Sequence, residues 1–173
     1  MREAVRHLFV YGTLRRALRH PMHGVLARQA RFVGEGWVRG RLFDLGRYPG
    51  VVLAGKAGRA AMPEESRGAC AQMGVEEPAS AEEMERVRGE VWALPGGQAG
   101  AMVLARLDSY EGCDASHPLP HEYRRITTLV HMDDGGRLRA WIYEYALDAD
   151  GLPVIDGGDY VAWRLRHGQA GGG

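Results

Sequence analysis

Apolar and polar residues alternate in short runs along most of the chain, a pattern typical of half-buried β-strands. The runs predict strands over residues 6–11, 37–44, 51–53 and 87–94. Two more runs, residues 123–131 and 138–145, flank an Asp-Asp-Gly-Gly turn at residues 133–136, which predicts a β-hairpin. The chain is therefore predicted to contain many short strands separated by glycine and proline.

Residues 98–110 have the periodicity of an amphipathic helix. Spacings of three and four place apolar side chains on one face: Met102, Val103, Leu107 and Tyr110. Glu111 follows at the C-terminal end of this helix, and Gly112 suits the left-handed conformation that commonly lies beyond a helix end. A carboxylate is therefore predicted at the negative end of the helix dipole.

Other helices are expected to be short. They are predicted over residues 80–86 and 160–165. Ser80 and Glu83 fit a capping box, in which each side chain satisfies an exposed amide of the other. Between residues 17 and 30, Pro21 and Gly24 interrupt the pattern, which indicates a turn or a short helix.

The composition suits one globular domain of 173 residues, with 45% apolar and 25% charged residues. Because 22 Lys and Arg residues balance 22 Asp and Glu residues, a long surface for nucleic acid is not expected, although a local basic patch could hold one small anion. No apolar run is long enough for a membrane helix, and the polar N-terminus does not resemble a secretory signal. We expect a cytoplasmic protein with neither a nucleic-acid nor a membrane partner.

The two cysteines, Cys70 and Cys113, are not spaced as metal ligands and do not suggest a disulfide framework. Cys113 lies two residues after Glu111 and could line a pocket there. No base is paired with it in the sequence, so we do not expect a nucleophile.

A binding loop is indicated where the first predicted strand runs into residues 11–14, which read Tyr-Gly-Thr-Leu. Glycine lets the chain bend so that the following amides can point at one anion or carbonyl oxygen. Residues 107–112 later read Leu-Asp-Ser-Tyr-Glu-Gly, and residues 123–125 read Tyr-Arg-Arg.

These three motifs, in this order, resemble the gamma-glutamylcyclotransferase-like family, which includes the gamma-glutamylamine cyclotransferases. Residues 40–49 and 88–92 look like the intermediate strands of that family, so the resemblance spans residues 8–145. It implies an α+β fold, a small mixed β-barrel with a few packed helices. It also implies release of 5-oxoproline from a small γ-glutamyl amine or peptide, with no metal and no cofactor.

By resemblance, Glu111 is the general base that takes a proton from the α-ammonium of the substrate. The substrate-binding residues implied by the family motifs are Tyr11, Gly12, Thr13, Leu14, Tyr123 and Tyr143. For Tyr11 the binding role is favoured over core packing, whereas Tyr123 and Tyr143 could equally serve core or interface packing. Asp108 is expected to be a structural hydrogen-bonding residue.

Some charged residues near the motifs are left out of the predicted site. Arg15 and Arg16 are expected to be solvated, with pairing to the substrate carboxylate as the alternative. His117 and His121 are spaced like helical metal ligands, but the prolines at positions 118 and 120 prevent a regular helix, so loop histidines are expected.

The resemblance also indicates a single domain over residues 1–167. Residues 54–86 join two strands by a longer path than the family uses, so they are interpreted as an insertion, either a surface excursion or a flap over the pocket. Residues 168–173 are expected to be a disordered tail.

Three functions are compatible with these features. The first is the cyclotransferase, and the second is a non-catalytic small-molecule-binding protein on the same scaffold. The third is a related transferase or hydrolase acting on another γ-linked amide. Glu111 favours an enzyme over a binding protein.

Overall fold

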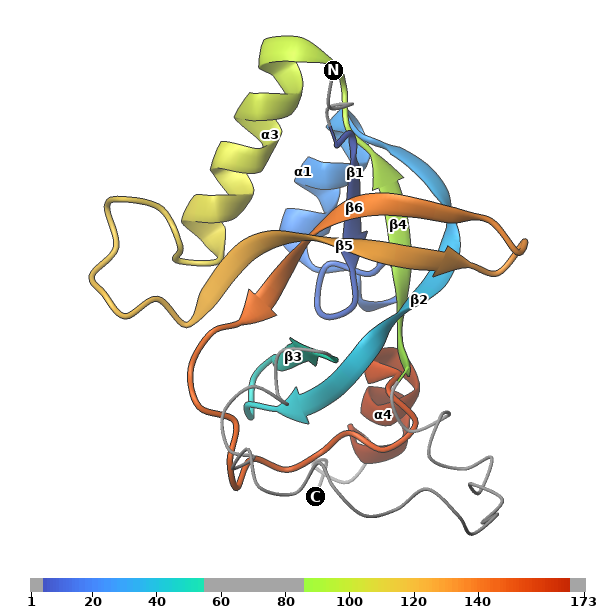
Figure 1. The fold of residues 1–173 in the computed structure, drawn as a ribbon, viewed down its shortest axis with the longest axis vertical. Coiled ribbons are helices and arrows are strands. Elements are labelled where there is room, and N and C mark those ends of the chain that lie inside the picture. The colour runs from blue at the N-terminus through green and yellow to red at the C-terminus, as the bar shows by residue number, and fades with distance from the viewer. Residues whose placement is uncertain (1–4, 55–85, 169–173) are drawn as a thin grey trace, which may run out of the picture.

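In the computed structural model, which describes residues 5–54 and 86–168, five strands close into a barrel and a sixth extends one of them (Figure 1). The strands are β1 (His7–Val10), β2 (Arg31–Asp44), β3 (Pro49–Leu53), β4 (Arg86–Ala93), β5 (Tyr123–Met132) and β6 (Arg137–Tyr145). The order around the barrel is β2-β4-β1-β6-β5, and β5 pairs with β2 again; β3 pairs with the second half of β2. This arrangement confirms the predicted α+β barrel.

The pairing is mixed. β1 is antiparallel to β4 but parallel to β6, with Leu8 opposite Trp141. β2 is antiparallel to β4, β3 and β5, and its contact with β5 closes the barrel where Trp37 lies opposite His131. Because side chains alternate between the two faces of each strand, every strand sends one set of residues inward and one outward.

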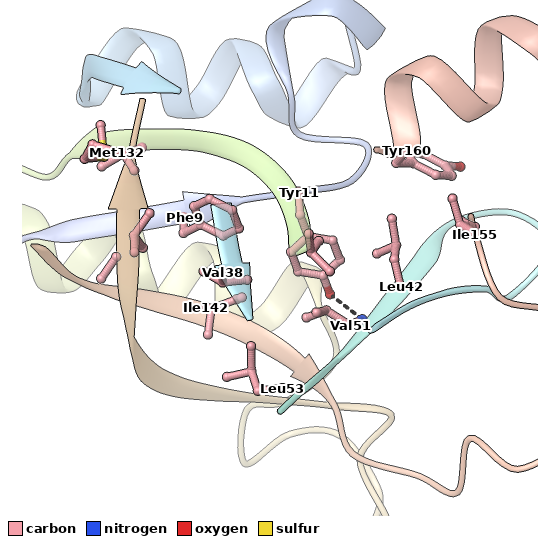
Figure 2. Packing of buried hydrophobic residues seen from close by; sticks show 14 residues of the cluster. Phe9, Tyr11, Val38, Leu42, Val51, Leu53, Met132, Ile142, Ile155 and Tyr160 are labelled. Atoms are coloured by element: carbon pink, nitrogen blue, oxygen red, sulfur yellow. Dashed lines mark hydrogen bonds between the residues drawn. The ribbon is translucent and has the colours of Figure 1, made fainter. Parts of the chain in front are cut away.

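Apolar side chains fill the interior of the barrel (Figure 2). They are Phe9, Tyr11, Val38, Leu42, Val51, Leu53, Val87, Val91, Val130, Met132, Ala140, Ile142, Ile155 and Tyr160. Burial of a large apolar side chain contributes about 1.5–3 kcal/mol to folding, so this cluster is a main source of barrel stability.

Helices cover the outside of the barrel. They are α1 (Pro21–Gln29), α3 (Gly97–Tyr110) and α4 (Tyr160–His167), with a 3-10 turn η1 (Arg16–Leu18) before α1. Leu26 of α1 and Val103 and Leu107 of α3 join a second core cluster with outward residues of β1, β4 and β6. In contrast, α4 lies near β3 at one end of the barrel, where Tyr160 enters the interior cluster (Figure 1).

The predicted strands and hairpin are confirmed, with one large difference in length. β2 begins at Arg31 and not at residue 37. Gly34 and Gly36 interrupt the apolar alternation there, and the register against β4 shifts between Phe32 and Gly34. A bulge of this kind interrupts the alternation of inward and outward side chains, so the sequence pattern does not reveal the strand there.

The helices differ more from their predictions. The short helix predicted between residues 17 and 30 is present as α1. Pro21 opens this helix instead of breaking it, because a first-turn proline loses no helical hydrogen bond. The buried face of α3 includes Val103 and Leu107, whereas Met102 is exposed. α4 extends two residues beyond its predicted end, to His167.

Some predictions fall outside the described residues. They include the helix over residues 80–86, except that Arg86 begins β4, and the tail beyond residue 168. The single domain and the insertion over residues 54–86 stay predictions. Within the described ranges, no helix is long and apolar enough to cross a membrane.

Candidate active site

A cavity of about 400 Å³ lies where β1 ends beside the C-terminus of α3. All seven residues predicted from the sequence line it: Tyr11, Gly12, Thr13, Leu14, Glu111, Tyr123 and Tyr143. The wall is completed by Phe9, Val10, His20, Arg47, Tyr48, Pro49, Tyr110 and Glu122. The fold therefore gathers the three sequence motifs around one space, and the roles of their residues toward a substrate stay predictions.

The loop after β1 presents free backbone donors beside this cavity. Within the described part of the chain, no hydrogen bond occupies the amide N–H groups of Gly12, Thr13 and Leu14. Gly12 is required by space, since a β-carbon there would lie 2.8 Å from Cγ of Pro49. Amides without a protein partner need water or a ligand, so the loop can receive an anion or a carbonyl oxygen.

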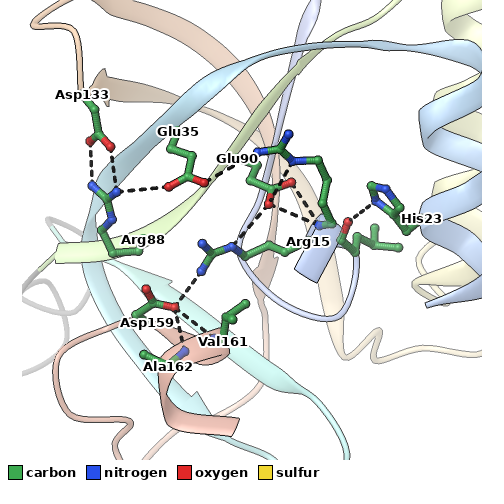
Figure 3. Close-up of polar contacts among 11 residues, drawn as sticks. Arg15, His23, Glu35, Arg88, Glu90, Asp133, Asp159, Val161 and Ala162 are labelled. Carbon is green, nitrogen blue, oxygen red and sulfur yellow. Dashed lines mark hydrogen bonds and ion pairs between the residues drawn. The ribbon is translucent and has the colours of Figure 1, made fainter. Parts of the chain in front are cut away.

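Buried charges hold this loop from behind (Figure 3). Nη1 of Arg15 donates to Oδ1 of Asp159 at 2.7 Å, and its Nε lies 3.9 Å from Oε1 of Glu90. The amide of Arg16 donates to both carboxylate oxygens of Glu90 at 3.2 Å. Only 6% of the surface of Arg15 and 2% of that of Glu90 is exposed to solvent. The prediction of a solvated Arg15 is therefore wrong, because the buried carboxylate of Glu90 needs a cation beside it.

Glu111 caps the C-terminal end of α3. Its amide donates to the carbonyl of Leu107 at 2.8 Å, and Gly112 follows with φ of 66°, as the sequence predicts. Burial of the carboxyl group, and secondarily the negative charge of Glu122, raise the pKa of Glu111 from 4.5 to about 7. The residue as a whole is only half-buried and lines the cavity. Its carboxyl group is therefore largely shielded from bulk water but accessible to a ligand in the cavity.

Three tyrosines fix the walls through their hydroxyl groups. Tyr11 donates to the carbonyl of Tyr143 at 2.6 Å, and Tyr123 donates to the carbonyl of Pro49 at 2.9 Å. Tyr143 donates to Oδ1 of Asp108 at 2.7 Å, which confirms the structural hydrogen-bonding role expected of Asp108. All three phenols thus already donate to protein acceptors, and a substrate could contact their rings or donate to their oxygens.

A second carboxylate stands in the cavity wall. Tyr48 donates to Oε2 of Glu122 at 2.9 Å, and the exposed Arg47 lies next to Tyr48 in the chain. Glu122 immediately precedes Tyr123, but it belongs to no motif that marked it in advance.

The sequence matches the family described as gamma-glutamyl cyclotransferase, AIG2-like, over residues 8–64 and 57–162. The chain belongs to this family. A solved structure of an uncharacterized protein from Pyrococcus horikoshii is 20% identical with a TM-score of 0.55, covering 98% of this chain and 100% of that one. An AIG2-like protein from Mus musculus is 22% identical with a TM-score of 0.55, covering 91% and 89%. No curated protein matches significantly.

In this member of the AIG2-like family, Tyr110 lines the cavity although it was not among the predicted site residues. Nδ1 of His20 accepts from the amide of Met22 at 3.2 Å, so the neutral ring carries its proton on Nε2. That nitrogen lies 3.3 Å from the Tyr110 oxygen and donates to it, and the side chain of Thr13 bonds the same oxygen. The Tyr110 hydroxyl is therefore held at the cavity wall by His20 and Thr13.

The other candidates of the sequence lie apart from this cavity. Burial, chiefly, raises the pKa of Cys113 to about 11, which disfavours a thiolate. His117 bonds Asp114 through Nδ1 at 2.7 Å, and His121 bonds the carbonyl of His117, both in the loop before β5. Across the described residues, no three His, Cys, Asp or Glu side chains gather as metal ligands.

Proposed function

We propose that the protein is a cofactor-independent cyclotransferase that releases 5-oxoproline from a γ-glutamyl amine or γ-glutamyl peptide. One observation carries the proposal: a carboxyl group with a pKa of about 7, Glu111, shares a cavity with the unoccupied amides of residues 12–14. A base and a set of oxyanion donors are what an intramolecular acyl transfer requires. Membership of the AIG2-like family supports the same reaction class.

In the first step, the Glu111 carboxylate takes a proton from the α-ammonium group of the substrate. A base with a pKa of about 7 is largely deprotonated at neutral pH and can therefore accept this proton. The freed amine attacks the γ-carbonyl carbon and forms the new C–N bond of a five-membered ring. Because the nucleophile is tethered, correct folding of the glutamyl chain can supply on the order of 7–11 kcal/mol.

Attack converts the γ-carbonyl oxygen into an oxyanion, which needs hydrogen-bond donors. The amides of Gly12, Thr13 and Leu14 supply these donors, and the Tyr110 hydroxyl adds a fourth. Protonated Glu111 then gives its proton to the leaving nitrogen as the original amide bond breaks. The ring nitrogen also loses its second proton, which ends on the departing amine and leaves it as an ammonium ion. The products are 5-oxoproline and a free amine or peptide, and Glu111 returns to its carboxylate form.

The test is 5-oxoproline release by the wild-type protein from a panel of γ-glutamyl amines, γ-glutamyl amino acids and γ-glutamyl-ε-lysine. Saturable release from any member supports a cyclotransferase. Saturable binding without release, measured by calorimetry on the same panel, would instead support the non-catalytic binding protein.

Tyr110→Phe is expected to lower kcat about 10²-fold, because loss of one preorganised oxyanion donor typically costs 10²–10³-fold. The ring stays, so KM is expected to change less than threefold. Steady-state kinetics on the preferred substrate provide the measurement. Tyr145→Phe is the control, since Tyr145 does not line the cavity; equal losses in both variants would argue against a role for the Tyr110 hydroxyl.

The acidic limb of the pH profile is expected to follow Glu111. Because the base must be deprotonated, kcat/KM is expected to fall tenfold per pH unit below about 7. Glu122→Gln removes a negative charge that raises the Glu111 pKa, so the midpoint moves to lower pH by less than one unit, burial being the larger cause. Asp150→Asn, an exposed carboxylate outside the cavity, is expected to leave the midpoint in place; a profile unmoved by Glu122→Gln contradicts the coupling.

A further inference from the structure

A group of exposed arginines surrounds two stacked rings on the outer face of the barrel, apart from the cavity. Arg39 of β2 lies opposite Arg86 of β4. Arg137 of β6 lies opposite His131 of β5, which itself lies opposite Trp37 of β2. The barrel closure thus brings together residues from four strands, and we call Arg39, Arg86, Arg137, Trp37 and His131 the arginine cluster.

The rings organise the cluster. Trp37 and His131 stack with their centroids 4.1 Å apart and their planes 5° from parallel. The guanidinium carbon of Arg86 lies 4.4 Å from the centre of the Trp37 ring, a cation–π distance. Arg86 is therefore held in place before any ligand arrives, which reduces the entropy lost on binding.

The carboxylates of Asp133 and Glu35 pair with Arg88, which is not part of the cluster. Asp133 accepts two hydrogen bonds from Arg88, at 2.6 and 2.7 Å, and Glu35 pairs with the same arginine (Figure 3). Among the described residues, no carboxylate forms an ion pair with Arg39, Arg86 or Arg137. Like charges directly opposite each other destabilise a sheet, so the cluster carries an uncompensated repulsion.

The positive charges of the cluster affect the pKa of His131. Burial lowers the pKa of its ring, and Arg137, Arg39 and Arg86 lower it further, in that order. All three arginines therefore lie within electrostatic range of the same ring.

We propose that the arginine cluster is a binding site for a compact multivalent oxyanion, a pyrophosphate or phosphate ester group. Guanidinium groups match the geometry of phosphate oxygens in bidentate hydrogen bonds. An anion held between Arg39, Arg86 and Arg137 would remove the repulsion within the cluster. The net charge of zero and the small extent of the cluster suit one such group better than a nucleic-acid backbone.

The probe is inorganic pyrophosphate at constant ionic strength, with binding followed by calorimetry and by the NMR titration of the His131 ring. Saturable binding is expected, together with a rise in the His131 pKa, because a neighbouring anion favours the imidazolium form. ADP is expected to bind within threefold of pyrophosphate, since His131 and Arg86 already cover Trp37 and leave recognition to the phosphates. ADP that binds more than threefold tighter would overturn recognition by phosphate alone.

The variant Arg39→Gln/Arg137→Gln is expected to weaken pyrophosphate binding at least tenfold and to abolish the shift of His131. Arg139→Gln, an exposed arginine on β6 that does not act on His131, is the matched control and is expected to change affinity less than twofold. Absence of saturable binding, or equal weakening in both variants, would overturn the proposal. Since no cluster residue lines the Glu111 cavity, the result is independent of the proposed cyclotransferase activity.

Discussion

Glu111→Gln is expected to lower kcat/KM for 5-oxoproline release by about 10³-fold, within the 10²–10⁴-fold that general acid–base catalysis contributes. The amide of glutamine has nearly the shape of the carboxylate but cannot take a proton from the α-ammonium group. The substrate contacts of the loop remain, so KM is expected to change far less than kcat. The measurement is steady-state 5-oxoproline release from the best substrate of the panel.

A folding measurement separates loss of chemistry from loss of structure in this variant. The pKa of Glu111 in the folded protein is raised, so the carboxyl group favours folding below its ordinary pKa of 4.5, and this advantage is lost as pH rises through about 7. The shift corresponds to about 3 kcal/mol at pH 8. Glu111→Gln should therefore be more stable than the wild type at pH 8 and equally stable at pH 4, as measured by urea unfolding. An inactive variant that is less stable at pH 8 would point to misfolding.

Arg15→Met is expected to destabilise the fold by about 3 kcal/mol, because removing one partner of a buried ion pair leaves the other charge uncompensated. Glu90 is almost fully buried and keeps only the contacts from Arg16, whereas Asp159 loses a 2.7 Å hydrogen bond. Methionine preserves much of the side-chain volume, so the decrease in the free energy of unfolding measures the effect of removing the charge. Urea unfolding at pH 7 gives the measurement.

Glu90→Gln combined with Arg15→Met completes a double-mutant cycle. The double variant is expected to be more stable than the sum of the two single losses by at least about 1 kcal/mol, since it no longer buries an unpaired carboxylate. Arg16→Met is the neighbouring control and is expected to cost less, because Arg16 is about half exposed. Additive single losses would show that Arg15 acts through packing alone.

The strands were predictable because they obey a local rule. A period of two appears wherever one face of a strand meets the core, as in β5 and β6. The first part of β2 has no such signal, since it pairs with two strands across a bulge and contains glycines at positions 34 and 36. The short helix α1 was predicted, but its start at Pro21 was not, because the effect of a proline depends on its position within a helix.

The candidate site was predictable only as far as its motifs reach. The loop at residues 11–14 and Glu111 belong to contiguous patterns, and the fold brings them to one cavity. His20 and Glu122 enter through tertiary contacts with residues far apart in sequence, Tyr110 and Tyr48 respectively. The burial of Arg15 likewise depends on Glu90 in another strand, and no pattern along the chain encodes that distance.

The parallel pairing of β1 with β6 has a consequence for how the protein acquires its activity. The hydrogen bond from Tyr11 to Tyr143 joins residues 132 positions apart, and the cavity draws its wall from both ends of that span. Folds dominated by such distant contacts fold slowly, in roughly milliseconds to seconds, since long loops must close before native contacts form. No short segment of the chain contains the cavity. The proposed release of 5-oxoproline is therefore expected to return during refolding only after the barrel has closed, so its recovery would report the rate of barrel closure.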